Sequence, residues 1–421
     1  MNRIVLIGNG FDLAHGLPTR YIDFINWYWD ECVNELRKCS LDKWSNKLCS
    51  FTIRDRNIRK ASFLFCGGIF YARPGTEIIN DIIENHRDSI YITFSPLFER
   101  ITKSIKNRGW VDIENEYYSL LSSLPESEDN KRAKELNDEL DYLRLLLAEY
   151  LNTVQTEANQ KKIINPSIWN VLLEPIRPEE IAISAAGLLD NFIEERIKLV
   201  EWESFLQSWN EELTTLDYLS SLRGIQEDYS KEGVEGLRNQ ILWEKFLLPD
   251  KMLLLNFNYT SIADDYLSWD KKKHHLINHI HGQLSYPDGM IFGYGDELDS
   301  GYKGILQRNN NEYLRNIKSI KYLETDNYRN MLAFIESAPY QIFIMGHSCG
   351  NSDRTLLNTL FEHRNCVSIK PYYYKREDET DTYMDIIQNI SRNFTDMKLM
   401  RDRVVNKQFC EPLPQSTSKK E

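Results

Sequence analysis

The residues best suited to chemistry follow short apolar runs, at the points where strands are expected to end. The first such turn is Gly8-Asn9-Gly10-Phe11-Asp12, directly after the apolar run 4–7. Glycines at the end of a strand allow backbone amides to approach a phosphate, and the next helix adds its positive N-terminal dipole. Position 13 is leucine, so the third glycine of a dinucleotide-binding fingerprint is absent. A plain tight turn is therefore the alternative to a phosphate-binding turn.

A second polar turn, Phe257-Asn258-Tyr259-Thr260, follows the apolar run 251–256. Ligands of open α/β sheets bind beyond the carboxyl ends of the strands. The Asn258 amide is therefore placed to hold a ribose hydroxyl or a water molecule. A cap on the following helix is the alternative role for this residue.

The third turn is His279-Ile280-His281-Gly282. Strand alternation predicts that both imidazoles lie on one face, where a histidine suits a general base near neutral pH. Half of the eight histidines lie between residues 274 and 281, so a metal site is the alternative. No nearby cysteine completes a ligand set, and we expect no metal.

The fourth turn, Gly346-His347-Ser348-Cys349-Gly350, follows the run 341–345 and precedes Asp353. Its GxSxG spacing matches the nucleophile elbow of α/β-hydrolases. Asp353 and His363 lie too close in sequence to complete such a triad. Binding of a phosphate or ribose by Ser348 is therefore the preferred interpretation.

Three carboxylates, Asp112, Glu114 and Glu116, alternate along one further segment. On a helix Asp112 and Glu116 would share a face and Glu114 would point elsewhere. The pattern fits an acidic helix start, with a two-carboxylate or metal-dependent site as the alternative.

The elements that must position these turns indicate a parallel sheet with a large insertion. Short apolar runs that alternate with helices are typical of α/β folds, and the β-branched run 4–7 reads as a strand buried on both faces. Leucines at helical spacing over 136–151 and 188–206 predict a helical block. We therefore expect an α/β fold with a Rossmann-type parallel sheet formed by residues 1–30 and 246–405, a helical insertion at 31–245, and a disordered tail at 406–421.

Composition excludes several classes of protein. Across 421 residues, 51 Lys and Arg against 63 Asp and Glu give a net charge of −12, so a broad nucleic-acid surface is not expected. Seven scattered cysteines without a CxxC pair are typical of free thiols in a reducing compartment. No run approaches the ~18 apolar residues of a membrane helix, and the N-terminal run is too short for a signal peptide. We expect a soluble, cytoplasmic protein.

Taken in order, these turns resemble the bacteriophage abortive-infection AbiH family over residues 3–360. The opening IGNGFDLAHGLPT, which includes Gly16, Pro18 and Thr19, is the most specific part, and the Trp110–Glu114 segment belongs to the pattern. The same order is also similar to a distant sirtuin-type NAD-binding fold. That resemblance implies that Asn258 positions the ribose and a water, and that His281 is the base.

The resemblance also implies a set of cofactor-binding residues: Gly8, Asn9, Gly10, Phe11, Asp12, Gly16, Pro18, Thr19, Tyr259, Gly346, Ser348 and Asp353. In it, Gly8 and Gly10 approach the pyrophosphate and Ser348 makes a late ribose or phosphate contact. Two residues depart from the sirtuin pattern: Asp12 stands in place of a serine, and Thr260 in place of an acid. The sequence contains no zinc module, so protein deacetylation is not expected.

The expected function is anti-phage defence by hydrolysis of NAD, with release of nicotinamide and depletion of NAD on infection. NAD, or a related dinucleotide, is then substrate or ligand. The expected macromolecular partners are a second copy of the chain or a partner defence protein, with a phage-derived trigger. The alternatives are a nucleotide-binding sensor that works with a partner effector, and a metal-dependent nuclease that uses Asp112, Glu114 and Glu116.

Overall fold

A computed structural model describes most of the chain. The described residues are 1–38, 42–54, 74–125, 129–161, 164–200, 247–267, 275–295 and 297–416. Cys39, Cys66 and residues 201–206 of the second leucine-rich helix lie outside them.

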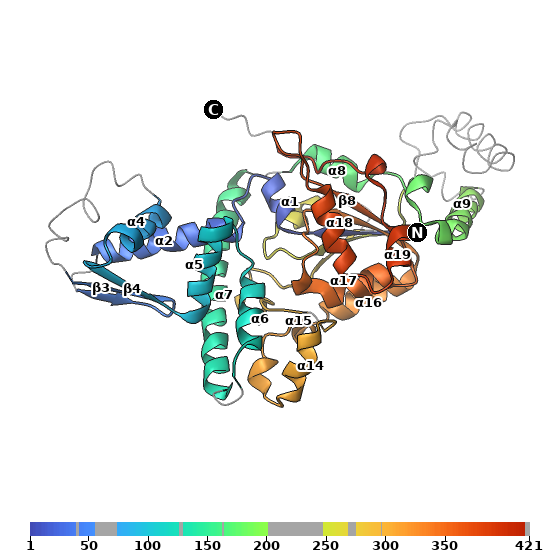
Figure 1. Cartoon of the computed structure of the whole chain (residues 1–421). Coiled ribbons are helices and arrows are strands. Elements are labelled where there is room, and N and C mark those ends of the chain that lie inside the picture. The colour runs from blue at the N-terminus through green and yellow to red at the C-terminus, as the bar shows by residue number, and fades with distance from the viewer. Residues whose placement is uncertain are drawn as a thin grey trace.

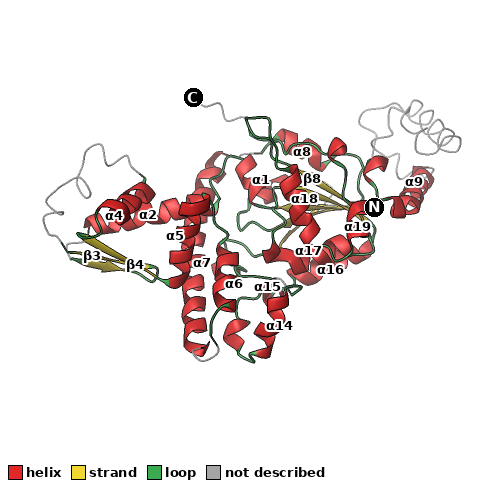
Figure 2. Cartoon of the chain, viewed as in Figure 1, coloured by secondary structure: helices red, strands yellow, loops and turns green. Residues whose placement is uncertain are grey.

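A five-stranded parallel sheet forms the centre of the fold (Figure 2). Its strands run in the order β6-β5-β1-β7-β8. The first strand of the chain is thus in the middle, and it pairs in parallel with β5 on one side and β7 on the other. This is the order of a doubly wound sheet, whose ligand crevice lies where the order reverses, here between β1 and β7. The bounds are Asn2–Ile7 (β1), Met252–Asn256 (β5), His275–His279 (β6), Tyr340–Met345 (β7) and Cys366–Tyr372 (β8). The predicted α/β fold with a Rossmann-type parallel sheet is confirmed.

The three central strands, β1, β5 and β7, are buried on both faces of the sheet, which explains why they contain continuous apolar runs. Alternate residues of β1 enter two separate cores: Val5 packs with one and Leu6 with the other. The Leu6 face is covered by α16 (Asn327–Ser337), α17 (Arg354–Glu362), α18 (Tyr383–Arg392) and α19 (Met397–Arg403). The Val5 face is covered by α1 (Asn9–Ala14), α8 (Pro166–Leu172) and helices of the insertion.

The insertion between α1 and β5 is mainly helical, and its longest element is α7 (Asp129–Lys161). Leu140, Leu143 and Leu147 of α7 are buried, as their spacing predicts. Figure 1 shows α7 running beside α5 and α6. The other helices are α2 (Tyr21–Lys38), α4 (Gly75–Asn85), α5 (Pro96–Arg108), α6 (Ile113–Ser122) and α9 (Ala186–Val200).

The insertion also contains a small antiparallel sheet, which the prediction of a helical insertion at residues 31–245 did not include. Its strands are β2 (Lys43–Ser45), β3 (Cys49–Ile53) and β4 (Ile90–Phe94), in the order β2-β3-β4. In Figure 1 this sheet lies with α2 and α4 at one end of the molecule, away from the parallel sheet. Strand β4 pairs with β3 across α4 and the segment before it, so no short hairpin signals the pairing.

The C-terminal segment is attached to the sheet up to residue 416. Leu413 is buried, and its amide donates to the Tyr373 carbonyl at 2.8 Å. The Ser416 amide donates to the Ala14 carbonyl at 2.7 Å. The disorder expected from residue 406 therefore does not extend to residues 406–416, because apolar side chains such as Leu413 bury surface there; residues 417–421 are not described.

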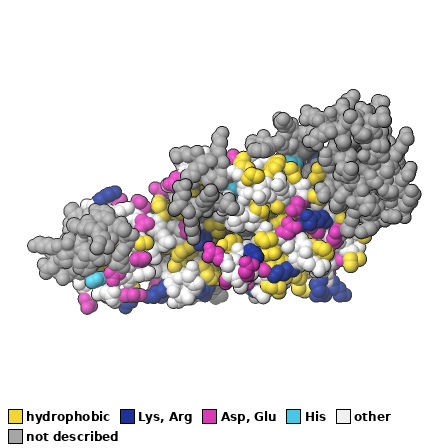
Figure 3. Space-filling view, turned by 90° about the horizontal axis from the view of Figure 1, so that it is seen from above, with side chains coloured by type: hydrophobic (Ala, Val, Ile, Leu, Met, Phe, Trp, Pro, Cys, Tyr) yellow, Lys and Arg dark blue, Asp and Glu magenta, His cyan; other side chains and the backbone are white. Residues whose placement is uncertain are grey.

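The surface agrees with the mixed charge of the sequence. On the face drawn in Figure 3, Lys and Arg side chains are scattered among Asp and Glu side chains. Among the described helices, none has the length and apolar character needed to cross a membrane.

Candidate functional site

One cavity of about 350 Å³ lies where the chain leaves β1, β5 and β7, at the reversal point of the strand order. Residues far apart in sequence line it together. The candidates among them are Gly8, Asn9, Asp12, Thr19, Asn258, Tyr259, His281, Gly346, Ser348 and Asp353. Gly10, Phe11, Gly16 and Pro18 are not among its lining residues. The structure therefore brings both candidate catalytic residues, Asn258 and His281, to one cavity.

The glycines of the first and fourth turns allow two loops to touch. The Gly10 amide donates to the Gly346 carbonyl at 2.8 Å, and the Gly8 amide donates to the Met345 carbonyl at 3.2 Å. A Cβ on Gly346 would lie 2.1 Å from the Phe11 nitrogen. The amides of Gly8 and Gly10 thus have partners within the protein, while Gly8 itself lines the cavity.

Asp12 holds the candidate asparagine in place. Its carboxylate accepts hydrogen bonds from Asn258 Nδ2 at 2.9 Å and from Thr260 Oγ1 at 2.7 Å. Asn258 Nδ2 also donates to the Gly8 carbonyl at 3.0 Å, so both amide protons are used and Oδ1 is left for a ligand or water. Burial raises the pKa of Asp12 to about 7. The two departures from the sirtuin pattern, Asp12 and Thr260, are therefore hydrogen-bonded to each other.

His281 lies in the turn just beyond β6 and is buried. Its Nε2 is 3.1 Å from Asp353 Oδ1 and 3.3 Å from the Tyr322 hydroxyl. Burial, and then the positive charge of Lys318, lower the pKa of His281. The imidazole is therefore neutral at pH 7, which is the form that accepts a proton.

The two histidines of this turn do not share a face, contrary to the expectation from alternation. Strand β6 ends at His279, and the chain turns at Ile280. His279 contacts Asp264 and Asn256, each at 3.2 Å, and does not line the cavity. Alternation predicts a common face only while the strand continues.

Asp353 connects His281 to a buried lysine that the sequence analysis did not single out. Lys318, the first residue of α15 (Lys318–Lys321), has Nζ 2.8 Å from Asp353 Oδ1. The same carboxylate lies 3.6 Å from His347 Nε2 through Oδ2. Although burial alone would raise it, the positive charge of Lys318 and the hydrogen bond with His281 hold the pKa of Asp353 well below its usual range. Asp353 is thus an anion that faces the imidazole.

Glu114 is the second carboxylate on Lys318. It lies 3.0 Å from Nζ and accepts a hydrogen bond from the Gly293 amide at 3.1 Å. Burial raises the pKa of Glu114, and the positive charge of Lys318 opposes this rise. A lysine in a four-residue helix gives no sequence signal of this role, and Glu114 is more than two hundred positions from Asp353 in the chain.

The three alternating carboxylates have separate environments. Helix α6 begins at Ile113, so Asp112 is its N-cap and accepts from the Asn115 amide at 3.0 Å. Glu116 accepts from Ser104 Oγ at 2.6 Å. Asp112 and Glu114, not Asp112 and Glu116, line the cavity, which corrects the predicted pairing. In the described part of the chain, no three His, Cys, Asp or Glu side chains are grouped to hold a metal ion.

The chemistry of the cavity follows from its charges and aromatic walls. Asp12, Asp112, Glu114 and Asp353 line it together with Lys318, so carboxylates outnumber ammonium groups among its described lining residues. Trp110 is 57% exposed on the lining, and Tyr21 and Phe257 add aromatic surface. Such a site favours a flat ring and a centre that carries or develops positive charge. The Asp353–His281 pair can take a proton from water, since a carboxylate stabilises the imidazolium that forms.

The chain matches a model of a known protein family. The family model described as "Bacteriophage abortive infection AbiH" matches residues 4–374, which include every segment that lines the cavity. No curated protein and no solved structure matches the chain.

Proposed function

The chain belongs to the bacteriophage abortive infection AbiH family, whose role is defence against phage, and from this premise we propose that it hydrolyses NAD. The bond cleaved is the N-glycosidic bond to nicotinamide. The products are nicotinamide, ADP-ribose and a proton, and the consequence in an infected cell is depletion of NAD. A phage-derived trigger activates the hydrolase in this proposal. It acts either on a self-associated form of the chain or through a partner defence protein.

The observation that carries the proposal is the neutral, carboxylate-bound imidazole of His281 in the same cavity as Asn258. That cavity lies at the reversal point of a doubly wound sheet, where such folds bind nucleotides. Its size falls within the range of small-molecule sites.

The reaction suits a site with these charges. The nicotinamide ring of NAD is positively charged, so the electron pair of the breaking bond neutralises the leaving group and no acid is required. Positive charge develops instead at the ribose carbon, where carboxylates that line the cavity, such as Asp112, stabilise it. The bond that forms joins this carbon to a water oxygen, and the water's proton passes to His281.

Asn258 has a positioning task in this reaction. Because Asp12 and the Gly8 carbonyl fix its NH2 group, its Oδ1 accepts a hydrogen bond from a ribose hydroxyl or from the attacking water. Because the ribose and the attacking water are then held in line, the reaction occurs within one complex and does not depend on an encounter in solution.

Purified protein incubated with NAD, with and without phage lysate, tests the proposal through nicotinamide release. We expect His281→Ala to lower release at least ~10²-fold, the usual contribution of a general base. His363→Ala is the matched control, because His363 contacts Glu336 at 3.2 Å and does not line the cavity. EDTA should leave the rate unchanged.

Three outcomes contradict the proposal. Absence of nicotinamide under every condition excludes the hydrolase. Tight binding of intact NAD without turnover favours the sensor. A strict requirement for a divalent metal favours the nuclease.

A further inference from the structure

A line of buried charges crosses from the helical insertion to the candidate base. It begins at Glu114 of α6, passes through Lys318 of α15 and Asp353, and ends at His281. The contacts measure 3.0 Å, 2.8 Å and 3.1 Å in that order. Three of these residues follow β6 in sequence, and Glu114 alone comes from the insertion.

The burial of this line shows that its members depend on one another. The side chain of Lys318 is 1% exposed, that of His281 6%, and those of Glu114 and Asp353 10% each. An ammonium group buried to this degree is stable only with anionic partners, and Lys318 has two. Loss of either carboxylate would shift Lys318 toward the other.

We propose that Glu114 and Lys318 position His281 by way of Asp353, so that helix α6 of the insertion completes the site. This inference rests on the proposed function, in which His281 is the base. Glu114 and Lys318 are positioning residues: Lys318 fixes the Asp353 carboxylate that holds the imidazole, and Glu114 fixes Lys318.

The charges that face His281 give the two positioning residues opposite effects. The imidazole is faced by Asp353, Lys318, His347 and the Tyr322 hydroxyl. Lys318 disfavours the imidazolium, so its removal should make His281 easier to protonate. Glu114 offsets part of the charge of Lys318, so its removal should make His281 harder to protonate.

The test follows the protonation of His281 directly. Full-length protein labelled with ¹³C-histidine is titrated by NMR, and the His281 signal is identified by its loss in His281→Gln. We expect Lys318→Met to raise the midpoint by about one pH unit and Glu114→Gln to lower it by a smaller amount. Lys318→Arg keeps the charge and should keep the midpoint.

Lys321→Met is the matched control for these variants. Lys321 lies on the same helix, α15, and forms a 2.8 Å pair with Glu324 outside the cavity. Its variant should leave the His281 midpoint unchanged. If Lys318→Met fails to fold, a lowered midpoint in Glu114→Gln beside an unchanged midpoint in Lys318→Arg still decides the inference.

The inference would be overturned if the His281 midpoint moved in the same direction in Lys318→Met and Glu114→Gln. It would also be overturned if the midpoint did not move in Glu114→Gln. The acidic limb of kcat/KM for nicotinamide release should follow the same shifts. Opposed NMR shifts without any release of nicotinamide would refute the proposed function and leave the positioning of His281 in place. Release with unchanged midpoints would refute the positioning alone.

Discussion

Asp12 is a buried carboxyl group whose hydrogen-bond partners are neutral, the Asn258 amide and the Thr260 hydroxyl. Burial is the main cause that raises its pKa to about 7, from an ordinary value of 3.8. The folded protein therefore binds a proton at Asp12 over a pH range in which the unfolded chain has already released it. Folding is favoured below that range, and the advantage is lost as the pH rises toward 7.

Asp12→Asn should remove this pH dependence, since an amide can accept from Asn258 and donate to the Thr260 hydroxyl. Between pH 5 and pH 7, the unfolding free energy of the wild-type protein should fall by about 2 kcal/mol more than that of the variant. Urea unfolding of both proteins at the two pH values measures the difference. Parallel curves would show that Asp12 is ionised throughout this range.

At the scale of single residues, the sequence predicts side chains that follow strands and misses those that reach the cavity from elsewhere. Asn258, His281 and Asp353 follow apolar runs, and parallel strands deliver their carboxyl ends to one edge. Lys318 starts a short helix and would ordinarily be a surface residue. Its burial depends on Glu114 and Asp353, and no local pattern records contacts over such sequence distances.

At the scale of elements, the loops after β1 and β7 are held together at glycines. Gly346 has φ +75°, in the left-handed region, and its backbone lies against Gly10 and Phe11. Gly16 has a similar φ of +80°, but a Cβ there would meet nothing within 4 Å. A substitution at Gly16 therefore tests the cost of the left-handed backbone alone. A substitution at Gly346 tests that cost together with the overlap between its side chain and the neighbouring loop.

Gly346→Ala should destabilise the protein by more than about 2 kcal/mol, because strain and overlap add. Gly16→Ala should cost only about 1 kcal/mol, the strain of a left-handed alanine. Thermal or urea unfolding of the two variants gives the comparison. Equal losses would mean that the loops separate readily and that contact between them contributes little.

The sequence predicts the strands that form continuous apolar runs and misses the strands that are short and half-buried. The central strands β1, β5 and β7 of the parallel sheet are buried on both faces, so each appears as an apolar run. Strand β3 alternates buried and half-buried residues, and its partner β4 follows only after α4. A five-residue alternation whose neighbouring partner, β2, is only three residues long is a weak signal.

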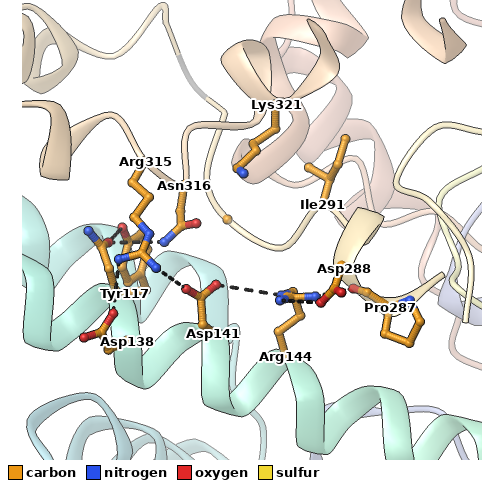
Figure 4. Close-up of polar contacts among 12 residues, drawn as sticks. Tyr117, Asp138, Asp141, Arg144, Pro287, Asp288, Ile291, Arg315, Asn316 and Lys321 are labelled. Carbon is orange, nitrogen blue, oxygen red and sulfur yellow. Dashed lines mark hydrogen bonds and ion pairs between the residues drawn. The ribbon is translucent and has the colours of Figure 1, made fainter. Parts of the chain in front are cut away.

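At the scale of the whole molecule, helix α7 joins the insertion to the segment that carries Lys318. Figure 4 shows Arg315 between Asp138 and Asp141, and Arg144 reaching Pro287 and Asp288. Arg315 is 2.7 Å from Asp141 and 3.1 Å from Asp138, but its side chain is 36% exposed. Exposed ion pairs of this kind contribute less than about 1 kcal/mol each.

The stronger connection is Asn137, which is fully buried on α7. Its Oδ1 accepts from the Tyr117 hydroxyl at 2.6 Å and from Asn316 at 3.2 Å, and its Nδ2 donates to Glu312. Asn137→Ala removes all of these bonds and leaves buried polar groups without partners. We expect a loss of about 3 kcal/mol in the free energy of unfolding.

Asn137→Ala should also release the segment that ends at Lys318, because Asn316 is only two residues away. Amide hydrogen exchange over residues 310–318 should increase at least ~10-fold in this variant, since a few kcal/mol of local stability is lost. Arg315→Met is the control and should leave exchange nearly unchanged, because its pairs are exposed to solvent. Nicotinamide release should fall with Asn137→Ala and persist with Arg315→Met. Faster exchange in the arginine variant than in the asparagine variant would show that the surface ion pairs, and not the buried amide, join the insertion to the site.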